Sequence, residues 1–343
     1  MSSAVRPRIF VTRRLPGPCF EKLLEEFDAE VWPEWQHPPY EVLLEKAREV
    51  DGIVSLLSDR IDCRLLTEGA KGNLRIVSQY AVGYDNIDVE CATRNGIYVT
   101  NTPSVLTEAT AELTWALILA TARRIVEADA YVRSGEWYRS GTGWHPELLL
   151  GMELEGKVLG IIGFGRIGRA VARIGAKGFG MKVLYYSRRR APEEVEKELN
   201  ATYVPLDTLL RESDIVSIHT PLTPETRYMI GERELRLMKP TAILVNTARG
   251  AVVDTNALVK ALKEGWIAGA GLDVFEQEPL PPDHPLTKLP NVVLAPHIGS
   301  ATKETRERMT CAVLENLLAF KKGEVPPNLV NPEVVEKRRP GFS

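Results

Sequence analysis

The sequence has few cysteines, and those it has are scattered. The four cysteines form no C-x-x-C pair and have no neighbouring histidine. This pattern argues against a disulfide framework and against a structural zinc site, and a reducing compartment is the simpler interpretation. We therefore expect no bound metal. The residues concerned are Cys19, Cys63, Cys91 and Cys311.

Long apolar runs are also missing. A membrane-spanning helix needs about 18 or more uncharged apolar residues, and the best attempt, 113–122, is much shorter. Residues 1–14 lack the apolar core and small-residue cleavage site of a secretory signal. We therefore expect a cytoplasmic protein without a membrane partner.

No charge of one sign dominates, since 43 basic residues face 46 acidic ones and the formal net charge is −3. A broad basic field is what binds a phosphate backbone, so no nucleic-acid partner is expected. The hydrophobic content of 44% and the charged content of 26% exclude a disordered or collagenous chain. At about 150 residues per domain, the 343 residues predict two domains.

Short β-branched runs alternate with helical patterns along the chain. This alternation predicts an α/β protein with parallel sheets covered on both faces, in two doubly wound units with the second inserted into the first. The predicted strands are 8–12, 52–56, 75–79, 97–100, 157–163, 182–187, 214–220, 242–248, 268–275 and 291–297. The predicted helices include 19–26, 40–50, a long one over 107–134, 254–264 and 303–322. Asp254 and Gly265 are placed to cap the helix over 254–264 at its two ends.

A glycine-rich turn follows one predicted strand and opens a predicted helix. In this context the first glycine allows a tight turn, the second lets the backbone approach a pyrophosphate, and the third lets helix and strand pack closely. The helix N-terminus then holds the diphosphate. The pattern predicts a dinucleotide site, and the alternative is a set of glycines that serve helix–sheet packing alone. Its residues are Gly163, Phe164, Gly165, Arg166, Ile167 and Gly168.

The end of the next predicted strand bears on the kind of dinucleotide. An NAD site usually has Asp or Glu there to hold the ribose hydroxyls, whereas this chain has Ser187, Arg188, Arg189 and Arg190. Serine and arginine would receive a 2′-phosphate through charge-assisted hydrogen bonds. NADP(H) is therefore favoured. The alternative is a solvated basic turn in a protein that binds NAD(H).

Three polar residues follow three different predicted strands. Arg249, Glu278 and His297 should converge, because ligands of open parallel sheets bind at the carboxyl ends of the strands. Reduction of a 2-oxo acid needs a cation for the carboxylate and carbonyl oxygens, and the arginine fork suits this role. The imidazole would give the carbonyl oxygen a proton, and the carboxylate would orient the imidazole and favour its charged form.

Each of these residues also has a structural interpretation. Arg249 could form a surface ion pair, His297 could be a hydrogen-bonded structural residue, and Glu278 could be a loop carboxylate. Glu276 competes with Glu278 for the place beside the imidazole. The joint placement of the three favours a catalytic site.

At this point the chain resembles a known family, the D-isomer-specific 2-hydroxyacid dehydrogenases, and within it the archaeal glyoxylate reductases. The matching segments are VGYDNID (82–88), TNTPSVLTEATAELTWALILA (100–120), GIIGFGRIGRAVA (160–172), NTARGAVVD (246–254), GLDVFEQEP (271–279) and PHIGSAT (296–302). The resemblance implies a discontinuous, flavodoxin-like substrate-binding domain of residues 1–106 and 298–343. It implies a Rossmann cofactor domain over 107–297.

The resemblance also implies roles for single residues. Arg249, Glu278 and His297 would occupy the catalytic positions, and Val82 and Gly83 would offer backbone N–H groups to the substrate carboxylate. Trp144 matches a tryptophan that reaches the partner's active site in homodimeric relatives, with a plain loop aromatic as the alternative. The implied cofactor contacts, beyond the glycine turn and Ser187, Arg188 and Arg189, are Thr107, Thr220, Pro221, Thr247, Ala248, Arg249, Asp273, His297 and Gly299.

The function expected from this resemblance is reduction of glyoxylate, and of hydroxypyruvate, by NADPH or NADH, giving glycolate or D-glycerate. A homodimer is expected, with contacts around 107–134. One alternative is a D-3-phosphoglycerate or broad-specificity D-2-hydroxyacid dehydrogenase, for which Arg60 and Arg64 are candidate phosphate ligands. The other is a dinucleotide-sensing binding protein like the corepressors that share this fold.

Overall fold

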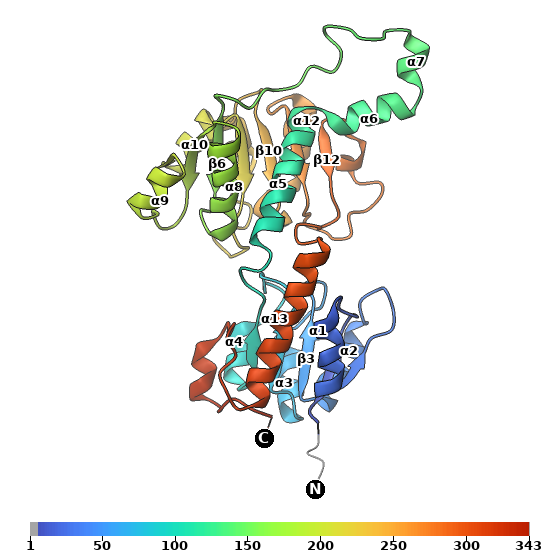
Figure 1. Cartoon of the computed structure of the whole chain (residues 1–343), viewed down its shortest axis with the longest axis vertical. Coiled ribbons are helices and arrows are strands. Elements are labelled where there is room, and N and C mark those ends of the chain that lie inside the picture. Colours follow the sequence, from blue (N-terminus) through green and yellow to red (C-terminus); the bar gives the residue numbers. More distant parts are fainter. Residues whose placement is uncertain (1–5, 343) are drawn as a thin grey trace. The chain divides into compact units, whose positions relative to one another are not determined.

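The computed structural model describes residues 6–342, which form two compact units (Figure 1). One unit consists of Met1–Leu106 and Ala301–Ser343, and the other of Thr107–Ser300. The chain returns to the first unit three residues later than predicted. The first five residues, part of the stretch inspected for a secretory signal, lie outside the described residues.

The first unit is built on a parallel sheet of five strands in the order β2-β1-β3-β4-β5. This is the strand order of flavodoxin-like folds and confirms the predicted fold class. The strands are β1 (Arg8–Val11), β2 (Asp28–Val31), β3 (Gly52–Ser55), β4 (Ile76–Gln79) and β5 (Tyr98–Thr100). The helices are α1 (Pro18–Glu26), α2 (Tyr40–Glu49), α3 (Cys63–Lys71), α4 (Val89–Arg94), α13 (Lys303–Lys321) and the 3-10 helix η3 (Pro332–Glu336).

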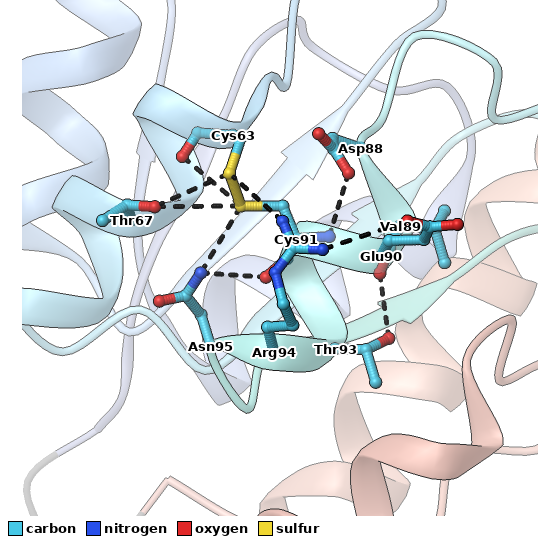
Figure 2. Close-up of polar contacts among 9 residues, drawn as sticks. All are labelled: Cys63, Thr67, Asp88, Val89, Glu90, Cys91, Thr93, Arg94 and Asn95. Carbon is cyan, nitrogen blue, oxygen red and sulfur yellow. Dashed lines mark hydrogen bonds and ion pairs between the residues drawn. A yellow bond between two sulfur atoms is a disulfide. The ribbon is translucent and has the colours of Figure 1, made fainter.

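Two disulfides join helices of the first unit, so the expectation of no disulfide framework is wrong. Cys19 of α1 pairs with Cys311 of α13, and Cys63 of α3 pairs with Cys91 of α4 (Figure 2). The Cα–Cα distances of 5.1 and 5.4 Å lie in the usual range. The partners are 292 and 28 residues apart in sequence, and only the packing of α1 on α13 and of α3 on α4 brings them together. Linear spacing could not show this.

The second unit is built on a parallel sheet of seven strands in the order β12-β11-β10-β9-β6-β7-β8. If β6 is taken as the first strand, this is the strand order of the Rossmann fold with one additional strand, β12, at the edge. The strand order reverses its direction between β6 and β9. The strands are β6 (Val158–Ile162), β7 (Lys182–Tyr186), β8 (Ala201–Tyr203), β9 (Ile215–Ile218), β10 (Ile243–Asn246), β11 (Gly269–Leu272) and β12 (Val292–Leu294). The helices are α5 (Thr107–Ala122), α6 (Ile125–Arg133), α7 (Glu136–Ser140), α8 (Arg166–Gly178), α9 (Glu193–Glu198), α10 (Leu206–Glu212), α11 (Glu232–Leu237), α12 (Thr255–Glu264), η1 (Gly250–Val252) and η2 (Pro285–Lys288).

Both faces of this sheet carry an apolar core, as a buried parallel sheet requires. Successive residues of a strand point to opposite faces. Ile161 and Val245 accordingly belong to one core cluster, while Ile162 and Leu244 belong to the other. The strands are therefore fixed in register, and every loop at their carboxyl ends is carried by a rigid sheet.

The predicted helix over 107–134 is broken in two, so the prediction of one long helix is wrong. Arg124 adopts a left-handed conformation with φ 54°, which separates α5 from α6. The returning segment at Met152 donates its N–H to the carbonyl of Ala122, so α5 ends in a tertiary contact. Neither α6 nor α7 contains a buried residue. Figure 1 shows the two helices reaching away from the body of the second unit.

Candidate active site

The glycine turn lies directly after β6, at the carboxyl edge of the seven-stranded sheet. Gly163 has φ 95°, a region that favours glycine, and a Cβ there would lie 2.5 Å from the carbonyl oxygen of His219. A Cβ at Gly168 would lie 2.2 Å from the carbonyl oxygen of Gly163. At Gly165 a Cβ would meet no described atom within 4 Å. The first and third glycines thus serve close packing, and the second leaves open space in front of α8.

This geometry fits a dinucleotide. Gly165 is the N-cap of the 13-residue helix α8, and no side chain accepts a hydrogen bond from the first N–H groups of the helix. These N–H groups are therefore available to a ligand in the open space. Thr220, two residues after β9, has a buried hydroxyl without a hydrogen-bond partner among the described residues. A buried polar atom of this kind marks a place where a ligand can supply the missing partner.

The basic turn after β7 is anchored at both ends. The Tyr203 hydroxyl donates to the carbonyl of Ser187 at 3.3 Å. Arg190 makes two 2.9 Å hydrogen bonds to the carboxylate of Glu196, and these bonds, with the hydrogen bond from the Tyr185 hydroxyl, lower the pKa of Glu196 to about 2. Arg190 is therefore committed to the protein itself. Arg188 and Arg189 are exposed, so their guanidinium groups are the ones accessible to a ligand.

The other predicted cofactor residues lie at the same edge of the sheet, with one exception. The exception is Thr107, which is the first residue of α5 and does not follow a strand of this sheet. The remaining residues follow successive strands: Thr220 and Pro221 after β9, Thr247 and Ala248 after β10, Asp273 after β11, and His297 and Gly299 after β12.

His297 and Glu278 form a close pair. The imidazole Nδ1 and the carboxylate Oε2 are 2.7 Å apart, and the side chains are 30% and 36% exposed, so the pair is half-buried and reachable. The other carboxylate oxygen of Glu278 accepts the N–H of Phe275 at 3.0 Å. Burial alone raises the pKa of Glu278, but the hydrogen bond and charge of His297 and the charge of Arg249 outweigh it and lower the pKa. The carboxylate is therefore ionised at neutral pH.

Arg249 reaches this pair from β10. It directly precedes η1, where a Cβ on Gly250 would lie within 2 Å of the Phe275 backbone, so the two loops touch. One guanidinium nitrogen of Arg249 donates to the carbonyl of Ala248 at 2.8 Å. Its charge adds to the larger effects of His297 and of the Phe275 N–H in lowering the pKa of Glu278. The structure thus brings together the three residues that the strand-end argument placed at one edge.

The competing residues are engaged elsewhere. Glu276 accepts the N–H of Thr255 at the start of α12 and the hydroxyl of Tyr228, at 2.9 and 2.7 Å. It holds the helix end and is not the partner of His297. Another histidine on this edge, His219, has its pKa lowered by burial to about 3 and is therefore neutral at physiological pH. Among the described histidines at this edge, His297 is the one that pairs with an ionised carboxylate.

Asp273 has a role that the sequence did not indicate. Its carboxylate, 1% exposed, accepts the N–H groups of Ile298 and Gly299 at 2.7 and 2.9 Å. Its carbonyl accepts the N–H of His297 at 2.9 Å. This turn fixes the backbone of the histidine, so Asp273 holds the site together whether or not it also contacts a cofactor. Alternation patterns give no signal for such a contact.

The predicted substrate residues lie in different parts of the chain. Val82 and Gly83 belong to the first unit, in the loop after β4, where their carbonyls accept from Asn101 and Gln79. Trp144 belongs to the second unit, in the loop after α7, and is 86% exposed. Arg60 and Arg64, the candidate phosphate ligands, both lie against the Tyr40 ring and pair with Asp62 and Glu41.

The chain is similar to known proteins over almost its whole length. Residues 115–299 match the family model described as D-isomer specific 2-hydroxyacid dehydrogenase, NAD binding domain. The chain is 66% identical over 337 residues to a glyoxylate reductase of Aeropyrum pernix, covering 98% of this chain and 99% of that one. It is 61% identical to a glyoxylate reductase of Thermococcus litoralis, covering 98% and 100%.

Solved structures agree. An NADPH-dependent glyoxylate/hydroxypyruvate reductase of Sinorhizobium meliloti, solved with NADP and malonate, superimposes with a TM-score of 0.83. It is 36% identical, with 96% of this chain and 98% of that chain covered. A protein of Thermus thermophilus superimposes with a TM-score of 0.86 at 50% identity, covering 94% and 99%. Among residues 6–342, no helix is long and apolar enough to span a membrane.

Proposed function

The chain belongs to the D-isomer specific 2-hydroxyacid dehydrogenases, and from that premise we propose that it reduces glyoxylate, and also hydroxypyruvate, with a nicotinamide dinucleotide. The products are glycolate and D-glycerate. The observation that carries this assignment is the 2.7 Å pair of His297 and Glu278 beside the charge of Arg249, at the carboxyl edge of a Rossmann sheet.

Each member of the trio has one task in this reaction. The Arg249 fork binds the substrate carboxylate and the carbonyl oxygen, where negative charge grows during reduction. His297 gives this oxygen a proton, and Glu278 orients the imidazole through their 2.7 Å contact. The bound reduced nicotinamide supplies the hydride to the carbonyl carbon. Val82 and Gly83 offer N–H groups to the carboxylate, so the first unit is the substrate-binding domain.

NADPH is the preferred reductant in this proposal. The glycine turn and the first N–H groups of α8 hold the diphosphate. Arg188 and Arg189, both exposed beside Ser187, take the 2′-phosphate, and no acidic residue of the turn repels it. Of the acidic residues that follow the turn, Glu193 pairs with Lys197 and Glu196 pairs with Arg190.

A phosphorylated substrate fits less well. Arg60 lies over the Tyr40 ring at 5.2 Å and pairs with Asp62 at 2.8 Å. Arg64 lies over the same ring at 5.8 Å. Both arginines thus have partners within the protein, and binding a phosphate would require them to leave these contacts.

The working form is a homodimer. Large apolar side chains stay exposed along α6, α7 and the following loop, and a contiguous apolar surface on a globular protein marks an interaction site. Because this segment is an extended arm without buried residues, a second copy of the chain is the occupant that covers it. Trp144 then lies at the partner's active site. The exposed residues are Ile125, Val126, Val132, Trp137, Tyr138, Trp144, Leu148 and Leu150.

Initial-rate kinetics test the function directly. Glyoxylate, hydroxypyruvate, pyruvate and 3-phosphohydroxypyruvate are each assayed with NADPH and with NADH. We expect the highest kcat/KM for glyoxylate with NADPH. A higher value for the phosphorylated substrate would support the phosphoglycerate dehydrogenase alternative, and tight dinucleotide binding without turnover would support a sensor.

A further inference from the structure

The Cys63–Cys91 disulfide lies beside the loop that carries the substrate residues. Its sulfurs belong to the first residue of α3 and to α4. Cys63 is half-buried, whereas Cys91 is 1% exposed. Cys63 is therefore the more exposed partner of the disulfide, and Cys91 is enclosed by protein.

The polar groups around this disulfide suit thiol–disulfide exchange (Figure 2). The Arg94 guanidinium lies 3.8 Å from the Cys63 sulfur, and the start of α3 adds positive potential on the same side. Around the Cys91 sulfur, the Asn95 amide lies at 3.5 Å and the Thr67 hydroxyl at 3.8 Å. A cation thus lies beside the Cys63 sulfur, the Asn95 amide lies beside the Cys91 sulfur, and the Thr67 hydroxyl is 3.8 Å from both sulfurs.

The disulfide clamps two loops together. Ile61 and Ile87 form a parallel bridge, in which Ile61 donates to the carbonyl of Asn86 at 3.0 Å and Asp88 donates to the carbonyl of Ile61 at 2.9 Å. The disulfide joins the same two segments. Cys63 lies two residues after Ile61, and Cys91 lies four residues after Ile87. Val82 and Gly83 lie immediately upstream in the clamped loop.

We propose that Cys63–Cys91 is an exchange site for dithiol reductants, and that opening it loosens the loop at 82–88 and weakens binding of the 2-oxo acid. This inference rests on the proposed function, because it takes Val82 and Gly83 as substrate contacts. The cofactor site lies on the other unit and keeps its affinity.

A thiolate of the reductant attacks the Cys63 sulfur, the Cys63–Cys91 bond breaks, and Cys91 leaves as a thiolate stabilised by Asn95 and Thr67. The second thiol of the reductant then attacks the reductant sulfur of the mixed disulfide and releases Cys63. Two electrons pass from the dithiol to the cysteines, and the two thiol protons end on Cys63 and Cys91. The reductant becomes a disulfide.

A metal is a weaker occupant for these sulfurs. Cys63, Asp88 and Cys91 lie within 4.8 Å of one another, but structural zinc takes four ligands. The Asp88 carboxylate already accepts the N–H of Cys91 at 2.9 Å as the cap of α4.

The test uses the full-length enzyme and graded dithiothreitol, followed by alkylation with iodoacetamide and mass mapping of the cysteine peptides. Cys19 and Cys311 are half-buried as well, so exposure does not separate the two disulfides. Because the Arg94 cation lies beside the Cys63 sulfur, we expect Cys63 and Cys91 to be labelled before Cys19 and Cys311. The KM for glyoxylate should rise about threefold or more with kcat nearly unchanged, as loss of ground-state binding predicts. The Kd for NADPH, from fluorescence titration, should stay constant, and oxidised dithiothreitol should restore the KM.

Matched variants separate this effect from general reduction. In a Cys19→Ser, Cys311→Ser double variant the KM should still respond to dithiothreitol. In a Cys63→Ser, Cys91→Ser double variant the KM should be high from the start and unresponsive. Arg94→Gln should slow the reduction of Cys63–Cys91 several-fold, because the incoming thiolate loses its attracting cation.

The outcomes discriminate between failures. No turnover of glyoxylate by the untreated enzyme would overturn the proposed function itself. Turnover with a KM for glyoxylate that does not change on reduction of Cys63–Cys91 would overturn the exchange site and leave the proposed function standing. A purified protein with stoichiometric zinc and no Cys63–Cys91 disulfide would assign the cluster to a metal instead.

Discussion

His297 occupies a backbone conformation that few side chains adopt, with φ 56°. Such positions persist only where the surroundings over-determine them, and they concentrate at functional sites. Here Asp273 supplies the constraint, because its carbonyl and carboxylate take up three successive N–H groups from His297 to Gly299. The imidazole direction is thus fixed by the backbone first and by Glu278 second.

Replacing Glu278 by Gln tests the charge of the pair. The pKa of Glu278 is lowered by His297 and Arg249 despite burial, so its negative charge is present through the neutral range and stabilises the protonated imidazole. The amide of Gln lacks that charge and no longer stabilises a positive charge in the pair. We expect the alkaline limb of the pH–kcat profile for glyoxylate reduction to shift to lower pH.

A His297→Ala variant is the reference for this profile. It should lower kcat about 100-fold or more, the usual contribution of a general acid, while NADPH still binds. Glu276→Gln is the matched control, since this carboxylate faces Thr255 and Tyr228. A profile for Glu278→Gln that matches that of the unchanged enzyme would remove the pairing from the mechanism.

Arg188→Asp tests cofactor choice at the same scale. A carboxylate would repel the 2′-phosphate and could hold the ribose hydroxyls of NADH, so the KM for NADPH should rise about tenfold or more while that for NADH changes little. Arg211→Asp, an exposed arginine of α10, carries the same change in charge and should affect neither KM. Equal rises for both cofactors would contradict a 2′-phosphate site.

At the scale of elements, prediction succeeded where the signal is local. Asp254 caps α12 by accepting the N–H groups of Asn256 and Ala257, and Gly265 ends the helix with φ 72°, as expected. The strand-end rule also brought Arg249 to the loop beside Glu278, because parallel strands deliver their following residues to one edge.

Prediction failed where tertiary contacts decide. The break at Arg124 lies next to a hydrogen bond from Met152, which is 28 residues further along the chain, to the carbonyl of Ala122. Strand β2 lies at the edge of its sheet and has the sequence DAEV, in which exposed residues alternate with half-buried ones and only one residue is β-branched. Such a segment carries no clear strand signal, so the sequence does not predict it. The disulfides were missed because spacing along the chain says nothing of helices that pack side by side.

The two disulfides should contribute differently to stability. Cys19–Cys311 ties α1 to α13 across 292 residues, whereas Cys63–Cys91 spans 28. Loop-closure entropy grows with the logarithm of length, so the longer link restricts the unfolded chain more, by about 2 kcal/mol. We expect Cys19→Ser, Cys311→Ser to lower the urea midpoint of unfolding more than Cys63→Ser, Cys91→Ser does. The reverse order would show that native contacts outweigh the chain-entropy effect.

At the scale of the whole molecule, the proposed homodimer rests on the arm of α6 and α7. Residues of a stable monomer that stay apolar and exposed are usually scattered, whereas these gather on one segment without a core of its own. A stable dimer buries roughly 800 Å² on each chain, mostly apolar at its centre. A projecting segment with several large apolar side chains can supply such a surface.

Val132→Asp tests this assembly. Burying an unpaired carboxylate in an apolar interface costs several kcal/mol, enough to raise a dissociation constant more than about 100-fold. We expect sedimentation equilibrium to give a monomer for this variant and a dimer for the unchanged chain. Val335→Asp, at a valine of η3 that is 40% exposed against 53% for Val132, is the matched control and should remain dimeric.

Trp144 would reach the partner's active site only in the dimer, so the Val132→Asp monomer should also show a raised KM for hydroxypyruvate. Trp144→Ala should raise this KM equally while the protein remains a dimer. A monomer with an unchanged KM would show that the dimer contact does not contribute to substrate binding.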